Sequence, residues 1–113
     1  MLPSDYRLRR DQDFDAVFQK GRSVFDAVCG VKFGETGRPY SRFAVVVGTK
    51  VSKSAVKRNR VRRQYREIIQ KHLAELKPGY DVILLTSAKS LPLTFQEKET
   101  GLLRVLAKAR LLV

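Results

Sequence analysis

The sequence is poor in the residues that build disulfide and metal frameworks. Its 113 residues include one cysteine, Cys29, one histidine, His72, and no tryptophan. A single cysteine excludes a disulfide framework or a cysteine-based metal site within one chain. Because Cys29 lies in an apolar strand pattern, we expect a buried thiol. His72 falls on the apolar side of a predicted helix, so we interpret it as a packing residue rather than a base.

Long apolar runs are also missing. No run approaches the roughly 20 residues that cross a bilayer. The first ten residues, MLPSDYRLRR, lack the apolar core of a secretory signal. We therefore expect a cytoplasmic protein with no membrane partner. Apolar residues make up 43% of the chain, which predicts one globular domain over residues 1–113, with residues 1–10 as a flexible N-terminus.

Acidic residues are few where basic residues are many. The net charge is +12, and no acid lies between Glu35 and Glu67. Eight of the seventeen residues from Lys50 to Arg66 are basic. This density favours a polyanionic partner. Nucleic acid is favoured over an anionic membrane, because the apolar stripe of the basic segment is expected to face a core.

The basic segment has the pattern of a helix from about Ser54 to Leu76. Its apolar positions have the i, i+4, i+7 spacing of a helix that lies on a core; they are Val61, Tyr65, Ile68, Ile69, His72 and Leu76. Cations occupy its first turns, where the helix dipole disfavours them. An external anion would offset this cost, so the pattern favours phosphate binding over a solvated basic face.

The other patterns predict a small α/β sandwich. A helix capped by Asp11 and ended by Gly21 is followed by one strand over residues 22–33 and a hairpin loop over 34–39. Strands over 43–47 and 80–86 are both expected to be central. Thr94 and Glu97 form a capping box that opens a last helix. The usual rule gives the strand–helix–strand unit from 43 to 86 a right-handed crossover.

No catalytic constellation can be assembled, so the composition favours a binding protein. Residues 50–67, KVSKSAVKRNRVRRQYRE, closely resemble the protein subunit of bacterial ribonuclease P, whose signature is an Arg-Asn-Arg triplet on a long helix followed by a basic pair. The resemblance covers nearly the whole chain, through DFDAVFQKGRS, PGYDVILLTS and LTFQEKETGLLRVL. One departure is that Thr49, Lys50 and Val51 stand where family members often have Ser-Lys-Lys, and Lys53 stands where they have glycine.

The resemblance implies a fold and a function. The fold is a ribosomal-protein-S5-domain-2-like α/β sandwich with a left-handed β-α-β crossover, in place of the right-handed one given by the general rule. The function is that of an accessory subunit of an endoribonuclease that removes the 5′ leader of precursor tRNA. The RNA subunit and its bound Mg²⁺ would carry out the hydrolysis. The expected partners are ribonuclease P RNA, with one protein per RNA, and precursor tRNA, but not DNA.

The resemblance also implies two surfaces and no catalytic or metal-binding residue. The first matches the helix that family members lay against the catalytic RNA: Lys50, Lys53, Lys57, Arg58, Asn59, Arg60, Arg62, Arg63 and Arg66. The second matches the cleft, between the first helix and the sheet, that receives the leader: Phe14, Phe18 and Lys32. Core packing is the alternative role for both phenylalanines, and holding the fold is the alternative for Arg58.

Three other functions compete with this one. A small ribosomal or general RNA-binding protein would carry the same charges without a catalytic RNA. A DNA-binding repressor could read the major groove with Asn59 and its arginines, but no helix-turn-helix is recognisable. A nuclease with its own active site would need acidic residues that the basic segment lacks.

Overall fold

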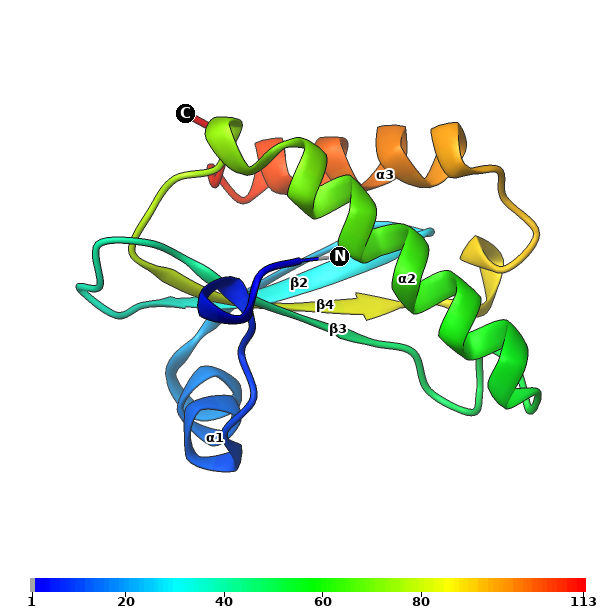
Figure 1. The fold of residues 1–113 in the computed structure, drawn as a ribbon, viewed down its shortest axis with the longest axis horizontal. Helices are drawn as coiled ribbons and strands as arrows, with labels where there is room; N and C mark the ends of the chain where they lie inside the picture. The colour runs from blue at the N-terminus through cyan, green and yellow to red at the C-terminus, as the bar shows by residue number, and fades with distance from the viewer. Residues whose placement is uncertain (1) are drawn as a thin grey trace.

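The computed structural model describes residues 2–113, which form a four-stranded sheet between two helical layers. The helices are α1 (Asp11–Lys20), α2 (Ala55–Lys71) and α3 (Phe95–Lys108), and the strands are β1 (Arg22–Phe25), β2 (Cys29–Glu35), β3 (Arg42–Val46) and β4 (Tyr80–Thr86). α2 and α3 cover one face of the sheet, and α1 lies on the other (Figure 1). The predicted α/β sandwich is confirmed.

The strands lie in the order β1-β2-β4-β3. β2 pairs antiparallel with β1 and β4, and β4 pairs parallel with β3. β4 is central, as predicted, but β3 is an edge strand, so the prediction of a second central strand was wrong. Its apolar run has another cause, since Phe43 and Val45 belong to the core beneath α2 while Ala44 packs on the core beneath α1.

The single strand predicted over residues 22–33 is in fact two strands. The chain reverses at residues 26–28, where the Asp26 N–H donates to the Cys29 carbonyl at 2.9 Å and the Asp26 carboxylate accepts from the Ala27 N–H at 2.6 Å. The turn was hidden because Phe25, Ala27 and Cys29 continue the period-two pattern through it. The predicted hairpin loop over 34–39 joins β2 to β3, and these strands are separated by β4.

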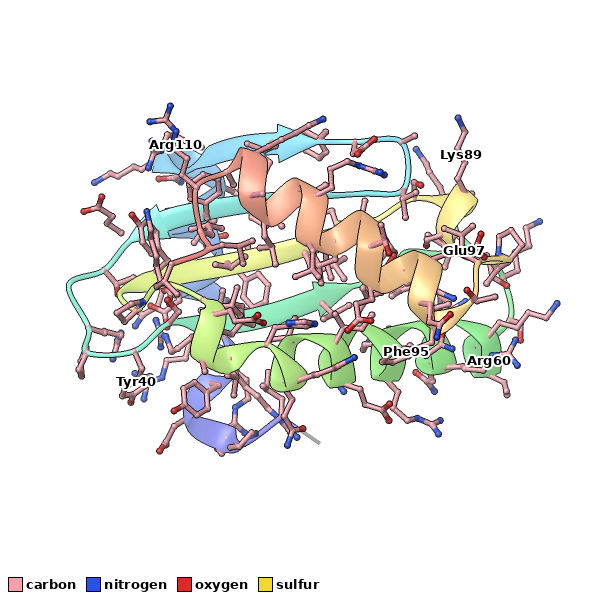
Figure 2. The ribbon with its side chains drawn as sticks, turned by 90° about the horizontal axis from the view of Figure 1, so that it is seen from above. Tyr40, Arg60, Lys89, Phe95, Glu97 and Arg110 are labelled. Atoms are coloured by element: carbon pink, nitrogen blue, oxygen red, sulfur yellow. The ribbon has the colours of Figure 1, made fainter. Side chains whose placement is uncertain are left out.

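β3, α2 and β4 form a parallel β-α-β crossover. Figure 2 views the sheet from the side of α2 and α3, with both strands pointing right and β4 above β3. The path from β3 through the helix in front to β4 therefore turns to the left of the strand direction, and the crossover is left-handed. The general rule for such units predicted the wrong hand here, whereas the family resemblance predicted the correct one.

α2 carries the main apolar stripe into the larger core. Four of its predicted inward positions, Val61, Tyr65, Ile68 and Ile69, are buried. Ser54 caps the helix by accepting a hydrogen bond from the Lys57 N–H. The helix ends at Lys71, earlier than the predicted Leu76, and the chain continues as a 3-10 helix over Leu73–Glu75.

Cys29 lies in the core beneath α2 and α3. It is 2% exposed, which confirms the predicted buried thiol. Burial raises the pKa of this thiol to about 11. A smaller core lies on the opposite face beneath α1 and consists of Leu8, Val17 and Ile83.

The N-terminal segment packs on the edge of β3, whereas we expected a flexible segment. Leu2 and Leu8 are only 1% and 4% exposed. Arg7 forms a parallel bridge with Phe43, and the Leu8 N–H donates to the Phe43 carbonyl at 2.8 Å. The physical reason is that two buried leucines and an open strand edge give the segment something to pack on. Met1 lies outside the described residues.

The helix caps agree with the sequence at α3 but not at α1. Thr94 and Glu97 form the predicted capping box. Asp11 does not cap α1, because the N-cap residue is Arg10 and Asp11 is the first helical residue. Asp11 and Asp13 instead lie in the first turn, where the helix dipole favours acids.

His72 links the end of α2 to α3. Its Nε2 lies 2.7 Å from a carboxylate oxygen of Glu99, which also lies 2.8 Å from the Lys71 ammonium, and its Nδ1 contacts the Glu75 carboxylate. Hydrogen bonds to Glu99 and Glu75 raise the pKa of His72 above 6.5. Hydrogen bonds from Lys71 and His72 hold the pKa of Glu99 below 4.5. His72 is therefore a packing residue with its polar atoms paired, as predicted.

This cluster predicts a pH dependence of stability. A raised histidine pKa stabilises the fold fully below the unfolded value of 6.5, and this contribution is lost as pH rises through the folded pKa. Glu99 contributes above 4.5, so the pair stabilises most between these two values. We expect the unfolding free energy in urea to fall as pH rises above 6.5 and through the raised folded pKa of His72 in the native chain, and to fall less in His72→Gln. Equal pH dependence in the two proteins would contradict the assignment.

Candidate nucleic-acid interface

α2 and the segment before it present a dense group of cations. We call Lys50, Lys53, Lys57, Arg58, Asn59, Arg60, Arg62, Arg63 and Arg66 the basic surface. Within residues 2–113, no carboxylate lies within salt-bridge distance of its eight cations, whereas Arg42, Lys71 and Arg104 are all paired. The first turn of α2 also contains no acid. The positive charge predicted for this segment is thus left open to solvent or to a ligand.

The side chains of the basic surface differ in their exposure to solvent. The three lysines are exposed, and so are Asn59, Arg60 and Arg63, while Arg58, Arg62 and Arg66 are half-buried. Arg58 donates from Nη1 to the Ser52 carbonyl at 2.9 Å, so it holds the turn before α2. This contact supports the alternative structural role for Arg58. The Asn59 side-chain oxygen accepts from Arg62 at 2.5 Å and so orients that guanidinium.

A shallow hollow of about 300 Å³ lies on the outer side of α2. It is lined by Asn59, Arg62, Arg63, Arg66 and Glu67. A hollow walled by three guanidinium groups suits an anion, because clustered arginines bind phosphate through several N–H donors. The structure therefore brings these four members of the predicted surface together in one place.

Arg60 lies apart from this hollow, toward α3. Figure 2 shows it beside the N-terminal end of α3, where Phe95 begins the helix. A second cation, Lys98, lies nearby; it is 1% exposed and donates to the Leu93 carbonyl at 2.5 Å. Burial, and then the charge of Arg60, lowers the pKa of Lys98. Sequence reasoning missed this lysine, because it stands at a helical position that the pattern does not single out.

The two predicted cleft phenylalanines have different environments. Phe14 is half-buried and packs against the small core of Leu8, Val17 and Ile83. Phe18 is 45% exposed, and the Lys32 ammonium lies 5.3 Å from the centre of its ring, within cation–π range. Phe18 and Lys32 therefore form a pair of an exposed aromatic ring and a half-buried cation, whereas Phe14 contributes to packing.

Sequence reasoning missed an apolar row on the same face of the sheet. Strand register places Phe25, Gly30, Leu85 and Val46 side by side across all four strands. Phe25 is 57% exposed and Val46 is 37% exposed. We call this row, with Phe18 and Lys32, the open strip. The row was missed because Phe25 was assigned to the buried side of one long strand, and the turn at residues 26–28 places it on the opposite face from Cys29.

Gly30 lets the Phe25 ring lie close to the sheet. A β-carbon at residue 30 would stand 2.0 Å from Cδ1 of Phe25. Any side chain there would displace the ring, so the flat aromatic face depends on glycine.

In the part of the chain that the structure describes, no three His, Cys, Asp or Glu side chains gather in a way that could hold a metal ion. Over the same residues, no helix has the length and apolar character needed to cross a membrane.

The sequence of this chain is similar to those of known proteins. The family model described as Ribonuclease P matches residues 2–110. The ribonuclease P protein component of Synechococcus sp. (strain JA-2-3B'a(2-13)) is 42% identical over 118 residues, which cover 100% of this chain and 88% of that protein. The component of Pseudanabaena sp. (strain PCC 6903) is 37% identical and covers 99% of this chain and 97% of its own.

Solved structures share the fold. The RNase P protein from Staphylococcus aureus is 25% identical, with a TM-score of 0.87, over 96% of this chain and 98% of that one. The RNase P protein from Thermotoga maritima is 29% identical, with a TM-score of 0.83, over 90% of this chain and 96% of that one. Because the family model spans nearly all of the sequence, the chain belongs to the ribonuclease P protein family.

Proposed function

We propose that the chain binds the RNA subunit of ribonuclease P with its basic surface and the 5′ leader of precursor tRNA with its open strip. It is a protein component of ribonuclease P and takes part in tRNA processing. In this role it assists endonucleolytic removal of the leader. One observation carries the proposal. Among residues 2–113 the eight cations of the basic surface have no acidic partner, and an exposed aromatic strip lies on the opposite face of the sheet.

The basic surface suits a folded RNA. Cations that neutralise backbone phosphates release condensed counterions, which gives affinity with little dependence on sequence. The outer hollow of α2 gathers three of these arginines, and Arg60 extends the charge toward α3. A long structured RNA offers phosphates over such a distance, whereas a small anion would occupy only one part of it.

The open strip suits single-stranded RNA. Exposed aromatic faces stack on unpaired bases whatever their identity, and Phe18 and Phe25 offer two such faces. Lys32 adds a charge next to Phe18 that can pair with a phosphate. A leader is the single-stranded part of precursor tRNA, so the strip would contact the precursor and not the mature product.

We propose that the RNA subunit, and not this chain, carries out the hydrolysis. Mg²⁺ would be bound mainly by that RNA and would stabilise the charge that develops at the cleaved phosphate. The role of this chain's own residues is to bind and orient RNA. We further propose one protein per RNA subunit and action in the cytoplasm.

Cleavage of precursor tRNA tests the proposal directly. The RNA subunit is assayed at low Mg²⁺ with and without the protein. We expect the protein to raise the cleavage rate, because its cations lower the repulsion between the two RNAs. A rate that does not change when the protein is added would overturn the proposal.

The basic surface predicts a salt dependence of RNA binding. We expect Arg63→Ala to weaken binding to the RNA subunit and to reduce the slope of log affinity against log salt by roughly one unit. Arg60→Ala should act in the same way if it contacts a phosphate. Arg110→Ala is the matched control, since Arg110 is exposed and lies at the other end of the molecule from Arg60 on α2 (Figure 2). An unchanged slope removes the phosphate contact from the residue tested.

The open strip predicts discrimination between precursor and mature tRNA. Loss of one base–aromatic stack costs about 1–3 kcal/mol, so Phe18→Ala and Phe25→Ala should weaken precursor binding by the holoenzyme and leave mature tRNA binding nearly unchanged. Both variants should stay close to the native chain in stability, because Phe18 is 45% exposed and Phe25 is 57% exposed.

Phe14→Ala is the comparison variant. Removing a fully buried phenylalanine costs about 3–5 kcal/mol, and half-buried Phe14 should cost part of that in unfolding free energy. If Phe18→Ala and Phe25→Ala fold normally and bind precursor as the native protein does, the open strip is not the leader site.

A further inference from the structure

A groove of about 440 Å³ runs beside the edge of β3. Its walls come from the N-terminal segment, α1, β3 and α2. The N-terminal segment contributes Arg7 and Arg9, α1 contributes Phe14, and α2 contributes Arg66. Figure 1 shows the N-terminal segment passing beside the middle of α2 before it turns down to α1. The groove therefore lies between the basic surface on one side of the sheet and α1 on the other.

Three arginines line this groove, and none of the described lining residues is acidic. Arg7 donates from Nε to the Leu2 carbonyl at 2.8 Å, and Arg9 donates to the Ser4 hydroxyl. These contacts place the two guanidinium groups without neutralising them. Among residues 2–113, no salt bridge is formed by Arg7, Arg9 or Arg66.

Arg66 and its neighbours Arg7 and Arg62 repel one another in the free protein. Burial lowers the pKa of Arg66, and the neighbouring charges of Arg7 and Arg62 lower it further. Like charges held together in a partly buried site destabilise the fold unless an anion joins them. The groove thus has the electrostatic character of an anion site, formed by residues that are far apart in the sequence.

The rest of the lining distinguishes among anions. Leu2, Leu8, Phe43 and Val45 contribute apolar surface, and the ring of Phe14 stands at the α1 side. An inorganic anion would gain nothing from these walls. A phosphodiester carries a ribose and a base next to its charge, so it can place the charge on the arginines and the sugar on the apolar surface.

We propose that Arg7, Arg9 and Arg66 together bind a backbone phosphate of an RNA strand that passes through this groove. Arg7 and Arg9 are thereby added to the RNA-binding residues, and the groove joins the basic surface to the face that carries the open strip. This inference rests on the proposed function, because it takes RNA as the partner. The phosphate belongs either to the RNA subunit or to precursor tRNA.

A double-mutant cycle on the full chain tests the shared phosphate. Arg9→Gln and Arg66→Gln are made singly and together, and Kd is measured against salt in two arms: protein with the RNA subunit, and holoenzyme with precursor tRNA. In one arm we expect each single variant to weaken binding and to reduce the log–log salt slope by roughly one unit. The double variant should lose less affinity than the product of the two single losses, because the second change finds the phosphate contact already gone.

Two matched variants separate charge from packing. Arg66→Lys keeps the charge and should keep the salt slope, whereas Arg66→Gln should not. Arg110→Gln, combined with Arg9→Gln, should give losses that simply multiply, since Arg110 lies far from the groove at the opposite edge of the molecule (Figure 2). Urea unfolding of each variant confirms that it remains folded.

If the double variant Arg9→Gln with Arg66→Gln loses less affinity than the product of the single losses, phosphate binding in the groove is supported. The arm in which this occurs identifies the RNA. Multiplicative losses in both arms, or unchanged slopes, overturn it. If the native protein binds the RNA subunit without salt dependence, the proposed function itself fails. If native binding is steeply salt-dependent but the cycle shows no coupling, only the groove is lost.

Discussion

The burial of one side of α2 is the constraint on which the rest of the structure depends. Val61, Tyr65, Ile68 and Ile69 fasten the helix to the sheet. Because this stripe is narrow, every other position of the helix must face outward or sideways. The cations therefore cannot spread away from one another, and packing energy holds them at a density that their mutual repulsion opposes. The protein keeps an electrostatically unfavourable surface because its apolar core does not allow the helix to rotate.

The edge position of β3 also influences function. An edge strand offers unpaired backbone groups along one side, and here the N-terminal segment covers part of that side through Leu8 and the bridge at Arg7. This contact brings residues from the start of the chain next to the middle of α2. The left-handed crossover places α2 above β3, so the basic surface and the N-terminal arginines meet at the same edge.

Patterns local to one element could be read from the sequence, and relations between elements could not. The stripe of α2, its start near Ser54 and the capping box of α3 depend on spacings within a few residues, and all three were predicted. The edge position of β3 and the turn at residues 26–28 were not. A strand flanked by helical layers on both faces looks apolar whether it is central or at an edge, and alternation continues through a short turn. The burial of Lys98 and the grouping of Arg7 with Arg66 arise only from tertiary packing.

The contact between Phe25 and Gly30 limits how this surface can change in evolution. A side chain at residue 30 would occupy the space of the Phe25 ring, so the two positions cannot vary independently. A substitution at Gly30 becomes tolerable once residue 25 is smaller, and a smaller residue 25 removes one flat face from the sheet. A substitution at either position therefore gives a protein with a weaker aromatic surface. The two residues are expected to be inherited as a pair.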